Sequence, residues 1–204
     1  MPHTSSKYHY SSDWIHQLED ERHWQYYHSQ QKLINKHLTL KANILELGIG
    51  SSFTSNYLKS KGFMVTTMDI DAAKEPDIVG NIVTENPPPQ VDTMLAFEVF
   101  EHIPYNEFLA TLKKLLNSNI KTILLSFPYN EKVWFDIDVR VHVFGRICFQ
   151  IATRRNRLTT NHHHWEIRYR QHSLQQIKND MTQCGYRIVD DYRKYSQHFF
   201  VLTR

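Results

Sequence analysis

The feature that most constrains the fold is a pair of glycines between an apolar segment and a polar one. Asn43–Leu47 is a short apolar run that predicts a β-strand, and Gly48-Ile49-Gly50 follows it directly. The polar stretch from Ser51 to about Lys61 predicts a helix, and Gly62 stands where a helix end favours glycine. This order predicts a strand, a tight turn and a helix whose first backbone N–H groups face a ligand site.

Apolar strands and helices alternate along the rest of the chain. Further strands are predicted at residues 63–68, 77–81, 91–97, 120–126, 186–190 and 198–202. Helices are predicted from Pro104 to about Leu116 and from Ser173, which forms a capping box with Gln176, to Gly185. We therefore expect an α/β fold, a seven-stranded and mostly parallel Rossmann-like sheet with helices on both faces and a C-terminal antiparallel hairpin.

The chain of 204 residues has the length of one domain with extensions. Residues 1–12 lack apolar periodicity and are expected to be a disordered tail, whereas residues 13–40 predict one or two helices that cap the domain formed by residues 41–204. The aromatic residues of that cap, Trp24, Tyr26 and Tyr27 among them, are expected to fold over a ligand pocket.

Residues 129–166 are rich in aromatic residues, valine and arginine and are expected to be an insertion on the substrate side. Within this insertion, apolar residues alternate with arginines over residues 144–157, a pattern that we interpret as an amphipathic helix. Such a helix could cover the core as a lid, form a dimer surface or contact a membrane surface, and we prefer the lid. A homodimer is thus one assembly that the sequence allows.

Composition excludes several classes of protein. The formal net charge is +3, too small to favour a polyanionic partner, so nucleic acid is not expected to be the substrate. Cys148 and Cys184 have neither metal-ligand spacing nor a disulfide pattern, which predicts a reducing, cytoplasmic location. No apolar run approaches the roughly 18 residues that a membrane-spanning helix needs.

Three polar residues mark the predicted edge of the sheet as a binding site. Glu46 lies in an apolar strand, where an unpaired carboxylate is costly. Asp69 ends the second strand, where an acid can bind ribose hydroxyls, and Asn81 ends the third, where an amide can bind adenine. A dinucleotide site normally has a third glycine where this chain has Phe53, so a ligand without a pyrophosphate is expected.

These motifs resemble those of class I S-adenosylmethionine-dependent methyltransferases. Residues 44–50 resemble the first motif of that family, and residues 65–71 resemble its second strand with the ribose-binding acid. Residues 95–104 resemble the fourth-strand motif of the methyltransferase domain type 11 group. The resemblance covers about residues 40–130 and 170–204. It implies a seven-stranded fold and S-adenosylmethionine as the cofactor.

The resemblance also implies roles for individual residues. Gly48 and Gly50 would pass under the methionine moiety, and Asp69 would hold the ribose, with Asp71 as the second candidate. The other contacts would come from Ile70 and Asn81 at the adenine and from Phe97 and Glu98 beside the sulfonium. The implied cofactor-binding residues are Glu46, Leu47, Gly48, Gly50, Asp69, Ile70, Asp71, Asn81, Ile82, Phe97 and Glu98.

The acceptor side is less constrained. A histidine or carboxylate near the acceptor can take up its proton, and the candidates are His102, Tyr129, His163, His164 and Glu166. Two alternatives remain open: His102 can instead pack at a helix start, and residues 161–167 can be a solvated loop anchored by Trp165. A metal site at His162–His164 is a third reading, which we do not favour because consecutive histidine side chains point in different directions and rarely bind one ion.

The sequence therefore predicts S-adenosylmethionine-dependent methyl transfer to oxygen or nitrogen of a small-molecule acceptor. The ending Phe97-Glu98 of the fourth strand favours this substrate class over nucleic acid. An RNA-modifying methyltransferase is an alternative, suggested by the mild basicity and the arginines at 154–157. A second alternative is a catalytically silent cofactor-binding protein with the same fold. The intact set of Glu46, Gly48, Gly50 and Asp69 favours an active enzyme.

Overall fold

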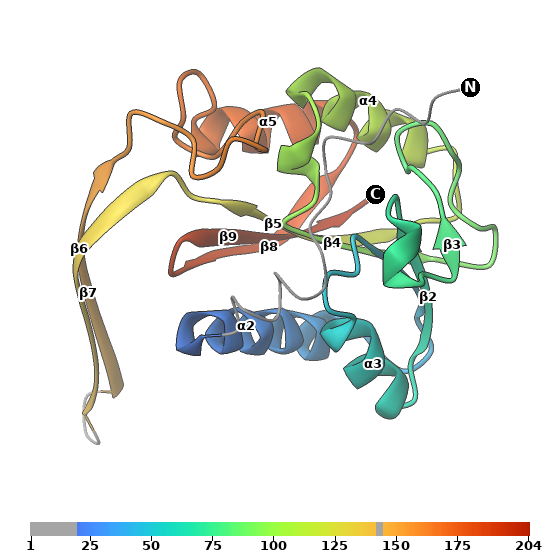
Figure 1. Cartoon of the computed structure of the whole chain (residues 1–204), viewed down its shortest axis with the longest axis horizontal. Helices are drawn as coiled ribbons and strands as arrows, with labels where there is room; N and C mark the ends of the chain where they lie inside the picture. Colours follow the sequence, from blue (N-terminus) through green and yellow to red (C-terminus); the bar gives the residue numbers. More distant parts are fainter. Residues whose placement is uncertain (1–19, 142–144) are drawn as a thin grey trace.

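The computed structural model describes residues 20–141 and 145–204. Seven strands form one sheet in the order β3-β2-β1-β4-β5-β9-β8 (Figure 1). Neighbouring strands from β3 to β5 are parallel, and β9 runs antiparallel to both β5 and β8. The predicted mostly parallel sheet with a C-terminal hairpin is thereby confirmed. The strands are β1 Asn43–Leu47, β2 Met64–Asp69, β3 Ile78–Val79, β4 Thr93–Phe97, β5 Thr122–Pro128, β8 Arg187–Lys194 and β9 Gln197–Thr203.

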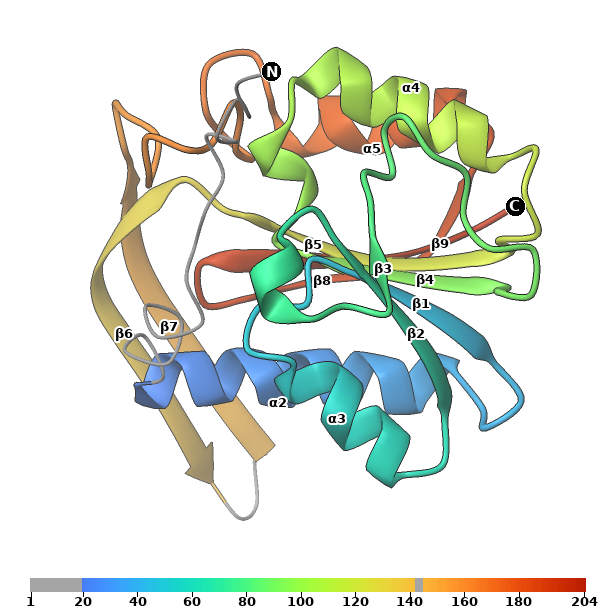
Figure 2. The ribbon, with the colours of Figure 1, turned by 45° about the vertical axis from the view of Figure 1, so that its right-hand side comes forward.

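Helices cover both faces of this sheet. α2 (Glu21–His37) and α3 (Phe53–Ser60) lie on one face, and α4 (Tyr105–Leu115) and α5 (Leu174–Gln183) lie on the other (Figure 2). Two short 3₁₀ helices, η1 (Ala72–Lys74) and η2 (Phe100–His102), follow β2 and β4. A buried apolar cluster lies on each side of the sheet, so the central strands are buried on both faces.

Capping residues explain where two of the helices begin. The side chain of Asp20 accepts a hydrogen bond of 3.0 Å from the backbone N–H of His23 at the start of α2. Ser173 does the same for Gln176 at the start of α5, at 3.1 Å, as its capping-box pattern predicts. The expected cap helix is thus described from Glu21 onward, whereas the tail predicted at 1–12 and residues 13–19 lie outside the described residues.

The segment between β5 and α5 forms a hairpin of two long strands. β6 (Glu131–Val141) and β7 (Gly145–Arg154) pair antiparallel in a separate sheet, at the left of Figure 1. The interpretation of residues 144–157 as an amphipathic helix was therefore wrong. Its apolar residues Ile147, Phe149 and Ile151 recur every second position, which is the period of a strand rather than that of a helix.

The hairpin leaves large apolar side chains in contact with solvent. Phe149 and Ile151 of β7 are exposed, and so are four residues of β6, Trp134, Phe135, Ile137 and Val139. In the described part of the chain, no helix has both the length and the apolar character needed to cross a membrane.

Trp165 fixes the loop that returns from the hairpin to the core. Its side chain is fully buried, with ring centroids 4.7 Å from Phe127 of β5 and 5.4 Å from Phe108 of α4. Its indole N–H donates to the carbonyl of Phe100 at 3.2 Å. Trp165 therefore ties the loop to η2 as well as to the core.

We expect Trp165→Ala to destabilise the fold by about 3–5 kcal/mol, because it removes a fully buried aromatic side chain and leaves a cavity. Chemical denaturation followed by circular dichroism measures this change. Trp134→Ala is the matched control, since that indole is 61% exposed and its loss should cost less than about 1 kcal/mol. Equal effects of the two substitutions would contradict the anchoring role of Trp165.

Candidate functional site

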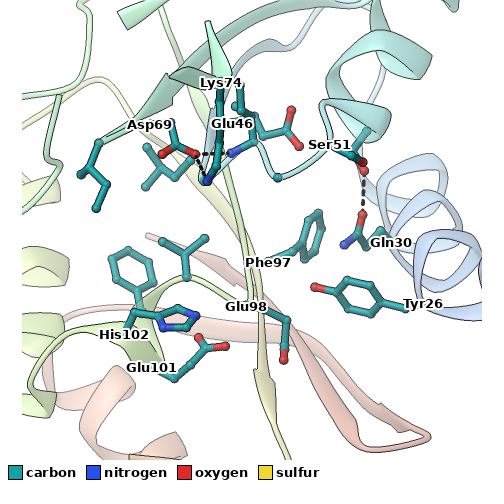
Figure 3. A pocket seen from close by; sticks show the side chains of 18 of the residues that line it. Tyr26, Gln30, Glu46, Ser51, Asp69, Lys74, Phe97, Glu98, Glu101 and His102 are labelled. Carbon is teal, nitrogen blue, oxygen red and sulfur yellow. Dashed lines mark hydrogen bonds and ion pairs between the residues drawn. The ribbon is translucent and has the colours of Figure 1, made fainter. Parts of the chain in front are cut away.

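A cavity of about 570 Å³ opens at the carboxyl ends of β1, β2 and β4. This edge is where open α/β sheets bind ligands. One part of the cavity wall is formed by α2, the turn after β1, the end of β2 and residues 80–83. The other part is formed by residues 97–103, the loop around His163 and the turn between β8 and β9. Figure 3 shows Glu46, Asp69 and Lys74 at one end and Glu98, Glu101 and His102 at the other, with Phe97 between them. We call these the cofactor end and the acceptor end.

The turn after β1 brings backbone rather than side chain to the cofactor end. Gly48 and Gly50 have φ angles of +67° and +54°, a region that other residues rarely adopt. A Cβ on Gly48 would lie only 2.8 Å from a methyl carbon of Val99. The backbone conformation therefore favours glycine at both positions, and close packing against Val99 adds a second reason at Gly48.

Asp69 organises this end of the cavity. Its carboxylate accepts hydrogen bonds from the backbone N–H groups of Ile49 at 3.0 Å and Asp71 at 2.9 Å. Lys74 Nζ lies 3.1 Å from the same carboxylate. The carboxylate of Asp71 instead accepts from the backbone N–H of Ala73 at the start of η1, and Asp71 does not line the cavity. Of the two predicted ribose acids, Asp69 is thus the one that a ligand in the cavity could reach.

Glu46 places a second acid at the same end. Glu46 is buried, and its Oε2 atom has no hydrogen-bond partner among the described residues. Burial raises the pKa of Glu46 to about 8, although hydrogen bonds from Ser55 act in the opposite direction. A cationic ligand group beside Glu46 would compensate this buried charge.

Most of the predicted cofactor residues meet at this cavity. Its lining includes Glu46, Leu47, Gly48, Gly50, Asp69, Ile70, Asn81, Ile82, Phe97 and Glu98, and Asp71 is the exception. The amide oxygen of Asn81 accepts a hydrogen bond from the backbone N–H of Val83 at 2.9 Å, which fixes this side chain within the loop that lines the cavity.

Glu98 begins the acceptor end. It has a φ angle of +55°, so the chain turns sharply where β4 ends. Ser126 Oγ donates to Glu98 Oε1 at 2.9 Å, and the hydroxyls of Ser126 and Tyr26 lie 3.2 Å apart. Burial raises the pKa of Glu98 to about 8, with Glu166 adding to the shift and Ser126 opposing it. The turn thereby directs an acid from the sheet edge into the cavity.

His102 and His163 lie side by side in the same wall. Their ring centroids are 4.8 Å apart, and His102 Nδ1 lies 3.3 Å from the carbonyl oxygen of His162. Burial, and then the neighbouring His163, lower the pKa of His102 to about 4. His102 is therefore neutral at pH 7 and can accept a hydrogen bond from a ligand.

Glu166 supports His163 from outside the cavity. It is fully buried and contacts Asn130 Nδ2 at 2.5 Å, the backbone N–H of Thr159 at 2.6 Å and His163 Nδ1 at 2.6 Å. Burial alone would raise the pKa of Glu166, but the hydrogen bonds from His163, Asn130 and Thr159 hold it below its ordinary value. Glu166 is therefore placed to orient the His163 ring.

The predicted acceptor-side residues divide into two groups. His102 and His163 line the cavity, whereas Tyr129, His164 and Glu166 do not. The ring of Tyr129 stacks on His198, and Arg193 lies 4.4 Å from its centroid. His164 is exposed, and its backbone N–H donates to the carbonyl of Glu101 at 2.8 Å.

Sequence reasoning missed several lining residues. Tyr26, Tyr27 and Gln30 come from α2, and only the tyrosines had a signal, as aromatic residues of the expected cap. Lys74 and Glu101 also line the cavity. Glu101 belongs to the quoted fourth-strand motif but had no role assigned, and nothing in the sequence marks Lys74.

We expect Glu46→Gln to stabilise the protein at high pH. The pKa of the Glu46 carboxyl is raised from its ordinary value of 4.5 to about 8 in the folded state. Between these two pH values Glu46 is ionised in the unfolded chain but protonated in the folded one, so the wild type loses stability as the pH rises. The variant lacks this loss. Its gain over the wild type should grow by up to about 4 kcal/mol between pH 5 and pH 8.5.

Urea denaturation at several pH values measures this difference. Glu75→Gln, at an exposed position, is the control and should show a nearly constant difference. A gain for Glu46→Gln that does not change with pH would contradict the buried-acid description.

Comparisons with known proteins agree with this geometry at the level of the fold. No protein-family model and no curated protein matches the sequence, so the type 11 assignment has no support beyond the motifs. Solved structures do match. Magnesium protoporphyrin IX methyltransferase from Synechocystis PCC 6803, determined with bound S-adenosylmethionine, has a TM-score of 0.58 and 17% identity over 89% of this chain and 79% of its own.

Two further structures show the same likeness. An S-adenosylmethionine-dependent methyltransferase from Clostridium acetobutylicum ATCC 824 has a TM-score of 0.56 and 12% identity, covering 93% of this chain and 94% of its own. The small RNA methyltransferase HEN1 has a TM-score of 0.60 and 12% identity, covering 98% of this chain but only 27% of its own. The chain therefore has the class I methyltransferase fold.

Proposed function

We propose that this chain is an S-adenosylmethionine-dependent methyltransferase that acts on oxygen or nitrogen of a small-molecule acceptor. The observation that carries the proposal is the cavity itself. It joins the glycine turn and Asp69 at one end to an acidic wall at the other, at the sheet edge where this fold binds its ligands. Its volume of about 570 Å³ is that of a small-molecule site.

The charge of the cavity suits the cofactor. Its described lining contains five acidic residues and one lysine, namely Asp20, Glu46, Asp69, Glu98, Glu101 and Lys74. S-adenosylmethionine carries an ammonium and a sulfonium, both cations, and it supplies an electrophilic methyl group. The unpartnered oxygen of Glu46 fits the ammonium, and the absence of a side chain at Gly48 fits a ligand that approaches the backbone.

The cofactor end would bind the ribose, and the acceptor end would bind the methyl acceptor. Asp69, with Lys74 balancing its charge, can accept hydrogen bonds from ribose hydroxyls. Neutral His102 can accept one from the hydroxyl or amine of the acceptor. Methyl transfer is an in-line displacement, so holding the acceptor at the far end from the ribose site would supply much of the rate.

The lining also supports a small acceptor over RNA: among its described residues Lys74 is the one lysine and it pairs with Asp69, so no cluster of basic side chains is offered to a phosphate backbone. Two arginines that suggested the RNA alternative donate hydrogen bonds to backbone carbonyls of this chain. Arg155 Nε donates to the carbonyl of Glu131 at 3.0 Å, and Arg154 donates to the carbonyl of Arg170 at 3.0 Å.

The acceptor class can be tested with S-adenosylmethionine labelled in its methyl group. The protein is incubated with a metabolite extract and, separately, with total RNA, and each is analysed for transferred label. We expect label in the small-molecule fraction. Label in RNA alone would overturn the acceptor class, and binding of the cofactor without any transfer would favour the catalytically silent alternative.

Cofactor binding should depend on Asp69. We expect Asp69→Asn to weaken binding of S-adenosylmethionine at least tenfold by calorimetry, since charge-assisted hydrogen bonds contribute about 1.5–3 kcal/mol. Asp71→Asn is the comparison, because its carboxylate caps η1 and does not line the cavity. Circular dichroism checks that both variants are folded.

Three outcomes count against this assignment. If Asp71→Asn weakens binding and Asp69→Asn does not, the ribose is held at Asp71. If the wild type binds neither S-adenosylmethionine nor its demethylated product, the proposed function fails. A response to NAD in their place would indicate a dinucleotide site.

A further inference from the structure

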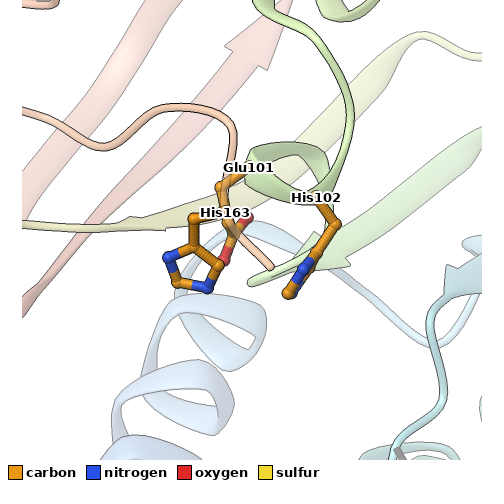
Figure 4. Close-up of side chains that lie close together, drawn as sticks. All are labelled: Glu101, His102 and His163. Carbon is orange, nitrogen blue, oxygen red and sulfur yellow. The ribbon is translucent and has the colours of Figure 1, made fainter. Parts of the chain in front are cut away.

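Three potential metal ligands converge in the acceptor end of the cavity. Glu101 and His102 come from η2, and His163 comes from the loop that Trp165 anchors (Figure 4). Each offers one ligand atom, and these atoms all lie within 4.8 Å of one another. Metal–ligand bonds of about 2.1 Å hold ligand atoms about 3–4 Å apart, so small side-chain rotations would bring all three ligand atoms within bonding distance of one ion.

Glu101 provides a second, independent observation that points to a cation ligand. The residue is fully buried, and neither carboxylate oxygen has a hydrogen-bond partner among the residues that the structure describes. A buried carboxylate without a partner is strongly unfavourable, and Glu98 adds a second acid nearby. Lys74, the one lysine of the described lining, pairs with Asp69 at the opposite end.

The surroundings of His163 are those of a supported ligand. Glu166 lies 2.6 Å from His163 Nδ1 and is itself held by Asn130 and Thr159. A carboxylate that binds one ring nitrogen of a histidine fixes the ring and its tautomer, an arrangement that commonly stands behind metal-binding histidines. His162 and His164, the neighbours of His163 in the sequence, are exposed.

We propose that Glu101, His102 and His163 bind a divalent first-row metal ion, with open coordination positions facing the acceptor. Two imidazoles and one carboxylate form a ligand set that suits such ions, and three protein ligands leave room for a substrate oxygen. The site sits in the cavity wall, so an acceptor can reach it.

The role of the ion rests on the proposed function, and with the ion bound His102 is a metal ligand instead of an acceptor of the substrate's hydrogen bond. An acceptor hydroxyl bound to a divalent ion loses its proton more easily, so the site favours O-methylation over N-methylation. The hydroxyl proton passes to solvent, the oxygen bonds to the methyl carbon, and the carbon–sulfur bond breaks with its electron pair remaining on sulfur. Substrates with a metal-chelating hydroxyl are the expected class.

Metal binding is tested on the full chain without cofactor. Protein stripped with a chelator is titrated with Mn²⁺ by calorimetry and by electron paramagnetic resonance. We expect one Mn²⁺ per chain and a shift of the melting temperature to higher values. Glu101→Gln, which keeps the shape of the side chain, and His163→Ala should each weaken binding at least tenfold. His162→Ala is the matched control and should leave the affinity unchanged.

Two results would overturn the proposal. Failure of the folded wild type to bind Mn²⁺, and equally Zn²⁺, would show that no metal site exists. Unchanged affinity in Glu101→Gln and His163→Ala, both folded by circular dichroism, would place the ion at other histidines. Cofactor calorimetry in the absence of metal is read separately, so a failure of the proposed function is distinguishable from a failure of the metal site.

Discussion

The carboxylate of Asp69 holds together the two turns on which the cofactor end depends. It lies at the end of β2 and accepts the backbone N–H of Ile49, which belongs to the turn after the neighbouring strand β1. It also accepts a hydrogen bond from the backbone N–H of Asp71, at the start of the loop that follows β2. Since parallel strands end at the same edge, one acid can connect both turns. The geometry of the glycine turn therefore follows from β2 as much as from the glycines themselves.

Both the cofactor end and the acceptor end of the cavity contain a buried acid. Glu46 and Glu101 are both buried and each has carboxylate oxygen without a hydrogen-bond partner among the described residues. A fold rarely retains such groups unless ligands compensate them, because desolvation of a charge is costly. One acid lies beside the glycine turn and the other beside His102. The ammonium of the proposed cofactor would compensate Glu46, and the proposed metal ion would compensate Glu101.

The sequence analysis succeeded where the pattern is local and failed where it is not. The strand–turn–helix at 43–61 was predicted because apolar period and glycine placement both act over a few residues. Residues 144–157 were misassigned because the arginines on either side of the apolar positions suggested the polar face of a helix, although Ile147, Phe149 and Ile151 keep the two-residue spacing of a strand. Glu46, Asp69 and Asn81 were predicted from their places on the strands, which topology brings together, and the other cofactor residues from the family resemblance. His163 could not be separated from His164, because the burial of Trp165 and the hydrogen bonds that hold Glu166 form only in the folded chain, and they determine which ring faces the cavity.

The hairpin of β6 and β7 is connected to the cavity by hydrogen bonds of residues next to the ends of its strands. Neither β6 nor β7 supplies a residue to the described lining, so the hairpin does not close over the cavity in this conformation. At its base, Asn130 donates to the carbonyl of Arg157 at 2.9 Å and to Glu166 at 2.5 Å. The same Glu166 contacts His163, whose ring faces the acceptor end. The two long strands can therefore differ in length or surface without disturbing the site, provided that Asn130 and Glu166 still hold the loop that delivers His163.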